Sequence, residues 1–309
     1  MPTRWDVVVV GGANTDVSAR GPALPAPDRP VLGDSFALSP GGKGVNQAVA
    51  AARLGAAVAL VARVGGDDRG DAILDRLVAE RVDARHVGRD RGEDTGAALI
   101  QVGPGGRKQT LGVPGANALL HAGDVEEARD VLENTRVLLA SLEVPLVAVE
   151  RAIQIARRAG AIVVLDPAPA RELPDWLLRM VDLIKPNEGE ALALTGVHVR
   201  GRITARAAAH RLLARGVGAV AVQAADEGNL IRWPDGEAWT PLLPVTAIDT
   251  TGAGDAYAAA LAVGLARGAD LASVAAYANT AAGLEAERLG ALRGLPTGSE
   301  VAAGIDRWM

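Results

Sequence analysis

The stretch VVVVGGANTD, residues 7–16, joins four β-branched residues to a polar end. A valine run without polar alternation is typical of a parallel strand that helices cover on both faces. Gly11 and Gly12 end the run, and Asn14 and Asp16 follow it. In open α/β sheets, ligands bind outside the carboxyl ends of the strands. The stretch therefore predicts a sheet and also the rim of that sheet on which a site lies.

Similar apolar runs recur along the chain, with helical patterns between them. The runs occupy residues 56–64, 137–142, 161–166, 183–185 and 219–223, and the helical patterns occupy 44–55, 70–82 and 146–160. This alternation predicts an α/β fold, a doubly wound and mostly parallel sheet flanked by helices. The length permits one large domain or two ordinary ones. Because we find no linker or internal repeat, we expect residues 1–309 to form a single domain.

Two segments interrupt the alternation of strands and helices. Residues 18–40 are rich in proline and too irregular for a crossover helix, whereas residues 95–113 resemble two strands joined by a Gly-Pro-Gly-Gly turn. We expect the inserted segments, at about 15–40 and 95–113, to form a small antiparallel β lid over the rim. The alternative is a pair of long surface loops, but the apolar and strand-like second segment favours the lid.

The composition argues against several classes of function. The chain has a net charge of −5, no basic stripe and 3% aromatic residues, which argues against a nucleic-acid partner. It contains no cysteine, and its four histidines lie far apart in the sequence, so disulfide, thiolate and histidine-zinc chemistry are not expected. Because no apolar run has the length of a signal peptide or a membrane span, we expect a soluble, cytoplasmic protein without a membrane partner.

A glycine-rich stretch, SPGGKGVNQAVAAARLG, occupies residues 39–55. Gly41, Gly42 and Gly44 would let a ligand approach the backbone, and Asn46 would lie in the first turn of the following helix. A P-loop requires Ser or Thr after its Gly-Lys pair, and here Gly44 follows instead. The turn after the first strand likewise lacks the glycine spacing of a dinucleotide-binding motif.

A second glycine-rich stretch, AIDTTGAGDAYAAALAVGL, occupies residues 247–265. A helix that begins near Gly252 directs free amides outward, and Gly252 and Gly254 allow close approach by an anion such as a transferring phosphate. Asp255 in the first turn has a simple explanation, because an acidic residue stabilises that end of the helix dipole. It can also orient an attacking hydroxyl and accept its proton, since a free Asp has a pKa of about 3.9.

The stretch KPNEGEALALTG, residues 185–196, places Asn187 and Glu190 one helical turn apart. The commoner explanation of this spacing is a capping box, in which each residue satisfies a backbone amide of the other. Its position after a strand and near the expected phosphate site favours the alternative, a water-mediated magnesium site.

Together, GGKGVNQA (41–48), PNEGE (186–190) and DTTGAGD (249–255) resemble the ribokinase family of carbohydrate kinases, the PfkB-type kinases. The resemblance extends from Asn14 to about Pro296. It implies ATP-dependent phosphorylation of a sugar hydroxyl, with conversion of D-ribose to D-ribose 5-phosphate as the first hypothesis. A kinase of a nucleoside, of pseudouridine or adenosine type, or a fructokinase-like enzyme is the alternative. A sugar- or nucleotide-binding regulator without turnover is a further one.

The resemblance also implies roles for individual residues. Asp255 matches the catalytic base, and the amides of Gly252, Ala253 and Gly254 match an anion hole. The residues that match sugar-binding positions are Asn14, Asp16, Gly42, Lys43, Asn46, Ala98, Ile100, Glu143 and Asp255. Those that match nucleotide-binding positions are Asn187, Gln223, Gly228, Gly252, Ala253, Gly254 and Asn279. Singly, several of these have bland explanations, for example Asn14 and Asp16 as turn formers and Asn279 as an ordinary helix residue.

Metal ions are implied in the same way. Asn187 and Glu190 match a Mg²⁺ site, and a monovalent cation, usually K⁺, is expected beside the anion hole. The residues that match this second site are Asp249, Thr251, Glu285, Arg288 and Gly290.

The chain departs from the family pattern at QAADEG (223–228), which replaces Thr-x-Gly-x-x-Gly, and at Gly294, where ribokinases often have serine. The exposed edges of a small lid, together with the resemblance, imply a homodimer joined through the lids.

Overall fold

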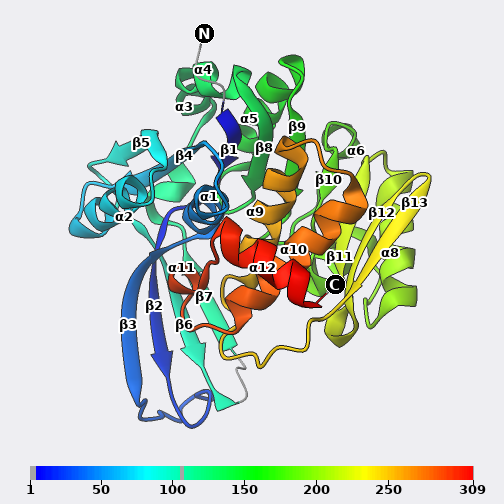
Figure 1. The fold of residues 1–309 in the computed structure, drawn as a ribbon. Helices are drawn as coiled ribbons and strands as arrows, with labels where there is room; N and C mark the ends of the chain where they lie inside the picture. The colour runs from blue at the N-terminus through cyan, green and yellow to red at the C-terminus, as the bar shows by residue number, and fades with distance from the viewer. Residues whose placement is uncertain (1–4, 105–107, 309) are drawn as a thin grey trace.

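A large sheet forms the centre of the molecule (Figure 1). Within residues 5–104 and 108–308, which the computed structural model describes, nine strands form it in the order β13-β12-β11-β10-β9-β8-β1-β4-β5. They are β1 (Trp5–Val10), β4 (Val58–Gly65), β5 (Asp83–Asp90), β8 (Thr135–Ser141), β9 (Ile162–Asp166), β10 (Leu183–Ile184), β11 (Ala219–Gln223), β12 (Gly228–Trp233) and β13 (Gly236–Pro241). Pairs from β11 to β5 are parallel, and β12 and β13 pair antiparallel. The predicted fold class is confirmed.

The valine run lies in β1, at the middle of this sheet. Val7 and Val9 pack into the core on one face, whereas Val8 and Val10 pack into the core on the other. All four are fully buried. The absence of polar alternation in the sequence therefore has the predicted cause, a strand with a helical layer on each side.

Helices cover both faces of the sheet (Figure 1). One core is formed with α1 (Lys43–Arg53), α2 (Asp68–Ala79), α9 (Ala253–Ala266), α10 (Leu271–Ala286), α11 (Ala291–Gly294) and α12 (Gly298–Trp308). The other is formed with α3 (Ala122–Glu127), α4 (Arg129–Glu133), α5 (Leu146–Arg158), α6 (Asp175–Leu178), α7 (Glu188–Thr195) and α8 (Arg202–Ala214). In the part of the chain that the structure describes, no helix combines the length and the apolar character needed to cross a membrane.

A second, four-stranded sheet projects from the rim of the main sheet (Figure 1). This small sheet has the order β3-β2-β6-β7 and consists of β2 (Asn14–Arg20), β3 (Ser35–Gly41), β6 (Gly96–Val102) and β7 (Lys108–Val113). Its outer pairs are antiparallel, as predicted, but β2 and β6 are parallel. Both of these strands follow main-sheet strands, β1 and β5, and leave the rim in the same direction. The turn expected at 103–106 lies partly outside the described residues.

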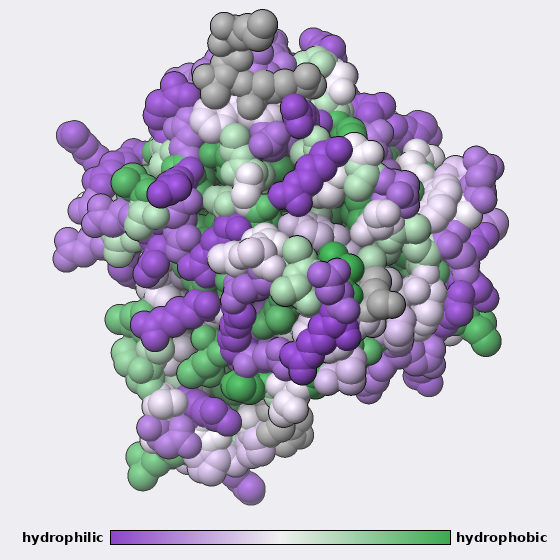
Figure 2. Space-filling model, viewed as in Figure 1, coloured by the Kyte–Doolittle hydropathy of each residue, from purple (hydrophilic) through white to green (hydrophobic). Residues whose placement is uncertain are grey.

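The small sheet has an apolar outer face. Phe36 and Leu38 of β3, Leu99 of β6 and Leu111 and Val113 of β7 are all exposed. Figure 2 shows apolar side chains over this part of the molecule, at the lower left. Ala98 and Ile100 alternate with Leu99 and point to the other face, so the strand period of two separates the two surfaces. A monomer rarely exposes so many large apolar side chains together.

Candidate active site

A cavity of about 730 Å³ lies between the rim of the main sheet and the inner face of the small sheet. Strand ends, the first turns of α1 and α9, and inward side chains of β2, β6 and β7 line it. It gathers most of the predicted site residues: Asn14, Asp16, Gly42, Lys43, Asn46, Ala98, Ile100, Glu143, Asn187, Gln223, Thr251, Gly252, Ala253, Gly254, Asp255 and Asn279. Segments far apart in the sequence thus meet at the carboxyl rim, as expected for an open α/β sheet.

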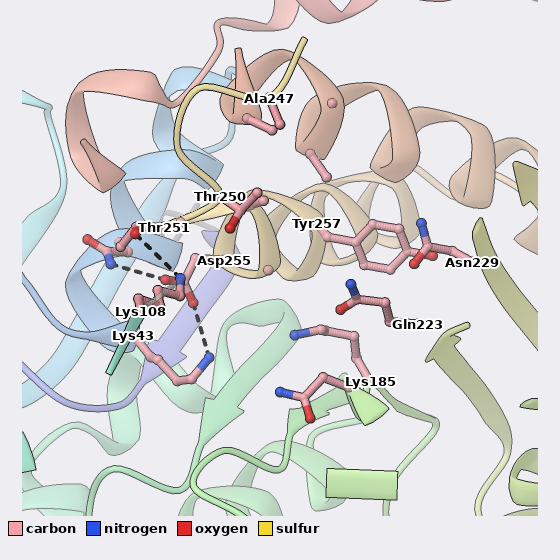
Figure 3. Close-up of a pocket in the computed structure, with 18 of the residues that line it drawn as sticks. Lys43, Lys108, Lys185, Gln223, Asn229, Ala247, Thr250, Thr251, Asp255 and Tyr257 are labelled. Carbon is pink, nitrogen blue, oxygen red and sulfur yellow. Dashed lines mark hydrogen bonds and ion pairs between the residues drawn. The ribbon is translucent and has the colours of Figure 1, made fainter. Parts of the chain in front are cut away.

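Asp255 lies in the first turn of α9 and faces the cavity (Figure 3). Asn46 Nδ2 donates a 3.0 Å hydrogen bond to Asp255 Oδ2, and Gln47 Nε2 donates a 3.1 Å bond to Oδ1. The two donors come from the first turns of α1. Because both carboxylate oxygens are held, the side chain has a fixed direction, which a group that orients a nucleophile requires.

Gly252 is the N-cap residue of α9. Its φ of 106° lies in the left-handed region that favours glycine. A Cβ added there would lie 2.7 Å from Glu285 Oε1 and 2.9 Å from Ala291 Cα, so the close approach of the 285–291 segment also requires glycine. Glycine at this position costs conformational entropy on folding, but it permits the turn that brings the start of α9 into the cavity beside Asp255.

The other glycine-rich stretch has a different reason for its glycines. A Cβ at Gly44 would lie 2.6 Å from the Gly11 carbonyl carbon, and one at Gly41 would clash with the Asp16 carboxylate. Gly42 has a φ of 87° and lines the cavity. Gly41 and Gly44 therefore serve close packing of the rim rather than the ligand approach expected from the sequence.

Two carboxylates occupy the end of the cavity next to the small sheet. Burial, together with the nearby carboxylates of Glu143 and Asp255, raises the pKa of Asp16 to about 7. Burial likewise raises the pKa of Glu143 to about 7, although Lys43 opposes the increase. Glu143 Oε2 also accepts a 2.8 Å hydrogen bond from the Lys43 amide. These groups, with Asn14, can accept hydrogen bonds from a polyol and donate few.

Asn14 owes its position to Asn117, in the 3₁₀-helix η2 (Gly115–Leu119). Asn117 Nδ2 donates a 2.7 Å hydrogen bond to Asn14 Oδ1, and Asn117 Oδ1 accepts a 2.8 Å bond from the Ala13 amide. The junction between β1 and β2 is thereby fixed against the end of β7.

A buried network of two lysines and one aspartate forms the base of the cavity. Lys43 Nζ lies 3.0 Å from Asp166 Oδ2, and Lys185 Nζ lies 3.4 Å from Asp166 Oδ1. Burial disfavours the Lys43 charge, but Asp166 and Asp255 outweigh this effect and hold the pKa of Lys43 well above its ordinary value. The two lysines similarly lower the pKa of Asp166 against the effect of burial. Lys43 and Asp166 therefore remain charged.

The opposite end of the cavity lies beside β11 and α10. Gln223, Asn229 and Asn279 line it, and Asn229 Nδ2 donates a 2.9 Å hydrogen bond to Asn279 Oδ1. Ala225, in the 3₁₀-helix η3 (Ala225–Glu227), has a φ of 51°. The backbone thus keeps a left-handed residue where the family pattern has glycine. Gly228 does not line the cavity. It is the first residue of β12, and a Cβ there would clash with the Thr240 carbonyl oxygen.

Asn187 and Glu190 form the capping box that the sequence suggests. Asn187 Oδ1 accepts a 2.9 Å hydrogen bond from the Glu190 amide, and Glu190 Oε2 accepts a 2.8 Å bond from the Asn187 amide. Asn187 lines the cavity, whereas Glu190 lies behind it and is buried. Burial and the nearby Asp166 raise the pKa of Glu190. Among the described residues, no group of three His, Cys, Asp or Glu side chains is arranged to hold a metal ion.

Asp249 and Glu285 lie behind the start of α9. Asp249 Oδ1 accepts a 2.9 Å hydrogen bond from the Thr251 amide, and Oδ2 accepts a 3.0 Å bond from the Gly290 amide. Glu285 is fully buried, and within the described part of the chain neither of its oxygens has a hydrogen-bond partner. Burial, together with the nearby Asp249, raises the pKa of Glu285 to about 9. Arg288 instead pairs with Glu300 at 2.6 Å.

This arrangement agrees with a known family of enzymes. The model of the pfkB family carbohydrate kinases matches residues 5–298 of the chain. The chain belongs to this family.

Individual pfkB proteins resemble the chain over nearly its whole length. The ribokinase of Haemophilus influenzae is 34% identical over 297 residues, which cover 96% of this chain and 97% of that protein. The deoxyribokinase of Salmonella typhi is 33% identical over 253 residues, 82% of this chain and 83% of that one. The structure of Arabidopsis thaliana ribokinase complexed with ribose and ATP has a TM-score of 0.88 at 27% identity, and the match covers 98% of this chain and 99% of that one.

Sequence reasoning did not assign site roles to several residues that this pfkB chain brings to the cavity. Lys185 and Lys108 line the cavity. Asp166 accepts hydrogen bonds from Lys43 and Gln47, and Gln47 also donates one to Asp255. Asp166 ends a predicted strand, so the rim rule that selected Asn14 and Glu143 also points to it. Lys108 has no such signal, because its role depends on how the small sheet folds back over the rim.

Proposed function

We propose that the chain is an ATP-dependent ribokinase, which converts D-ribose and ATP to D-ribose 5-phosphate and ADP. One observation carries the proposal: the held carboxylate of Asp255 faces the same cavity as the backbone of Gly252, Ala253 and Gly254 at the start of α9. Membership of the pfkB family and the similarity to ribokinases over nearly the whole chain support it.

Asp255 acts as the general base in this proposal. It orients the attacking hydroxyl and accepts its proton as the bond to phosphorus forms. The amides of Gly252, Ala253 and Gly254 form an anion hole for the transferred group, because the start of a helix presents free N–H groups and partial positive charge. Phosphoryl transfer depends mainly on such positioning and charge neutralisation.

The sugar lies at the end of the cavity next to the small sheet. Asn14, Asp16, Asn46 and Glu143 supply polar atoms for several hydroxyl groups, along with Gly42 and Lys43. A site built to hydrogen-bond hydroxyls rejects analogues that lack them, because its buried polar groups are then left unpaired. Ala98 and Ile100 cover the sugar and exclude water, which limits hydrolysis of ATP.

ATP occupies the other end of the cavity, beside Gln223 and Asn279, with Gly228 setting the turn that follows Gln223. A Mg²⁺ ion held through water would lie near Asn187, which faces the cavity, and the Glu190 carboxylate in the cap behind it would add negative charge. Mg²⁺ is ordinarily bound by few protein ligands, together with waters and phosphate oxygens, whose charge it neutralises.

A monovalent cation, K⁺ in our proposal, fits beside the anion hole. The buried Glu285 carboxylate has no described hydrogen-bond partner and lies close to Asp249, and two such carboxylates together favour a cation between or beside them. Backbone carbonyls of Thr251, Arg288 and Gly290 would complete an oxygen site of the kind that hard cations prefer. Such a cation would supply positive charge that stabilises an anion bound at the start of α9.

We further propose that residues 1–309 work as one domain in which the small sheet is the lid, and that two copies associate through their small sheets. The exposed apolar outer face and the strand edges of this sheet support the homodimer. Sedimentation of a monomer at micromolar concentration would contradict it.

A substrate panel tests the proposed activity. The purified protein is assayed for ADP production with ATP, Mg²⁺ and K⁺ and, in turn, ribose, 2-deoxyribose, fructose, adenosine and pseudouridine. We expect the highest kcat/KM with ribose. Turnover of a nucleoside or of fructose without turnover of ribose would contradict the ribokinase proposal, and binding of ribose without ADP release would indicate a regulator. Preference for 2-deoxyribose would make the chain a deoxyribokinase, a second candidate that its similarity to such an enzyme supports.

A further inference from the structure

The chain contains only three lysines, and all of them line the candidate active site. Among its 32 Lys and Arg residues the lysines are Lys43, Lys108 and Lys185, and every other cationic side chain is arginine. Each of the three faces the same cavity. An ammonium group is a compact point charge with three donors, which suits a phosphate that moves during reaction, whereas a guanidinium is a planar fork. The composition therefore suggests that the cavity requires lysine rather than arginine at these three positions.

Two of the three lysines have carboxylate partners. Lys43 pairs with Asp166 and with Asp255, and Lys185 pairs with Asp166. Lys108 differs from both, because it forms no ion pair with any residue that the structure describes. Its Nζ instead donates a 3.4 Å hydrogen bond to Thr251 Oγ1 (Figure 3). Its charge is therefore free to interact with an anionic ligand.

The contact with Thr251 places the Lys108 ammonium beside the start of α9. Thr251 immediately precedes Gly252, the N-cap residue of the helix. Lys108 reaches this point from β7 of the small sheet, whereas Lys185 reaches it from the main sheet, with Nζ 3.4 Å from a Cβ added at Gly254. The helix start therefore has one ammonium from each sheet.

The charges around Lys108 give the same location. Burial raises the pKa of Asp16, and Lys108 opposes the increase. Burial also raises the pKa of Glu285, and Lys108 again opposes it. Asp16 belongs to the sugar end of the cavity and Glu285 lies behind Gly252. Lys108 is therefore near both carboxylates, in agreement with its hydrogen bond to Thr251 beside the start of α9.

We propose that Lys108 is a catalytic residue whose ammonium contacts the phosphoryl group during its transfer from ATP to the sugar; this rests on the proposed function. In that step the sugar oxygen forms a bond to the γ-phosphorus, and the bond from this phosphorus to the β–γ bridging oxygen breaks. Its electron pair leaves with ADP, the hydroxyl proton passes to Asp255, and Lys108 keeps its own proton. The ammonium neutralises negative charge on the phosphoryl oxygens.

A pair of substitutions on one strand tests the proposal. Lys108→Met removes the ammonium, and Gln109→Met makes a similar change at the next residue of β7, which is exposed and outside the described lining of the cavity. For each variant, kcat is measured with ribose and ATP. Tetrafluoroaluminate, which mimics the transferred phosphoryl group, is titrated into the complex with ADP, Mg²⁺ and ribose. ADP and ribose affinities are measured separately by calorimetry.

We expect Lys108→Met to lower kcat by about 10- to 1,000-fold, the range for loss of one charged or hydrogen-bonding group to a transition state. Tetrafluoroaluminate binding should weaken by at least about tenfold, while the affinities for ADP and ribose change by less than about threefold. Lys108→Arg should recover part of the loss, and Gln109→Met should behave as the wild type.

Two outcomes overturn the proposal. If Lys108→Met keeps the wild-type kcat and tetrafluoroaluminate affinity, Lys108 does not contact the phosphoryl group. If ADP and ribose affinities fall as far as the affinity for tetrafluoroaluminate, its role is structural. Both outcomes leave the proposed function intact, provided that the wild type phosphorylates ribose. A wild type that phosphorylates no member of the substrate panel contradicts the proposed function as well.

Discussion

Asn46 and Asp255 join the first turns of α1 and α9 through a 3.0 Å hydrogen bond from Asn46 Nδ2 to Asp255 Oδ2. They are 209 residues apart in the sequence, and each lies in the first turn of a helix whose N-cap is a glycine with a positive φ. The carboxylate is consequently held by one glycine-rich motif while it belongs to the other. The two glycine-rich motifs therefore form one site.

The Asp255→Asn variant tests the proposed base. Asn keeps the shape of the side chain but cannot accept the hydroxyl proton, so we expect kcat to fall by about 10²- to 10⁴-fold, as is typical when a general base is lost. Ribose affinity should change by less than about threefold. Coupled detection of ADP gives the rate, and calorimetry gives the affinity. Asp235→Asn, in the exposed turn between β12 and β13, is the matched control. Wild-type turnover in Asp255→Asn would exclude this residue as the base.

Proton release on sugar binding tests the two buried carboxylates. Asp16 and Glu143 each have a pKa of about 7, so both are partly protonated at neutral pH. Sugar hydroxyls that donate hydrogen bonds to them favour the ionised form and lower the pKa values. We therefore expect ribose binding to release protons at pH 7 and to release almost none at pH 9. Calorimetry in buffers of different ionisation enthalpy measures the release.

The same carboxylates affect the stability of the protein without ligand. Their pKa values in the folded state exceed those of unfolded Asp and Glu, so the folded chain binds more protons between about pH 4 and pH 7. Their contribution to the free energy of unfolding is thus greatest at low pH and is lost as the pH rises through about 7. Asp16→Asn should reduce both the proton release on ribose binding and the pH dependence of the free energy of unfolding. Uptake of protons on ribose binding at pH 7 would contradict the assignment.

Removal of the monovalent cation tests Glu285. A cation that binds the folded chain raises its stability, so replacing choline chloride with KCl should raise the Tm of the wild type. In Glu285→Gln we expect this shift to shrink by about 2 °C or more, because one charged ligand is lost. In choline chloride the variant should be about as stable as the wild type, since a Glu285 carboxyl with a pKa of about 9 is mostly protonated and uncharged at neutral pH. Glu287→Gln, which is only partly buried, is the control. An equal KCl shift in all three proteins would argue against a cation at Glu285.

A glycine substitution tests the backbone conformation of the QAADEG segment, residues 223–228. Ala225 adopts a φ of 51°, and a left-handed conformation costs an L-residue about 1–2 kcal/mol. Ala225→Gly should therefore raise the free energy of unfolding by about 0.5–1 kcal/mol after the greater entropy of unfolded glycine is allowed for. Ala224→Gly, at a φ of −107°, should lower it instead. Urea denaturation of both variants checks the sign, and equal losses would show that Ala225 is not strained.

Much of the fold could be predicted from the sequence because parallel strands buried on both faces produce uninterrupted apolar runs. The run in β1 is the best example, since its valines divide between two cores. The strands that escaped prediction lie at the edges: β5 has the sequence DARHVGRD, and β12 and β13 form an edge hairpin. Edge strands are partly exposed, so their sequences carry polar residues that weaken the pattern.

The candidate site was predictable where its residues follow strands or belong to the glycine motifs, as Asn14, Glu143 and Asp255 do. It was not predictable for side chains that are buried behind the cavity wall or that the small sheet brings over the rim. Glu190 belongs to a local cap that spacing alone explains, and its burial near Asp166 emerges only in the folded chain. Lys108 belongs to an exposed strand, and only the position of the small sheet over the rim brings it to Thr251.

The confinement of every lysine to one cavity also gives the protein an unusual chemical selectivity. Apart from the terminal amine of the chain, an acylating reagent that attacks primary amines finds its targets only at Lys43, Lys108 and Lys185. The mass added to tryptic peptides containing these residues is then a direct record of how open the cavity is. Shielding by saturating nucleotide or sugar can thus be mapped residue by residue, without any engineered label.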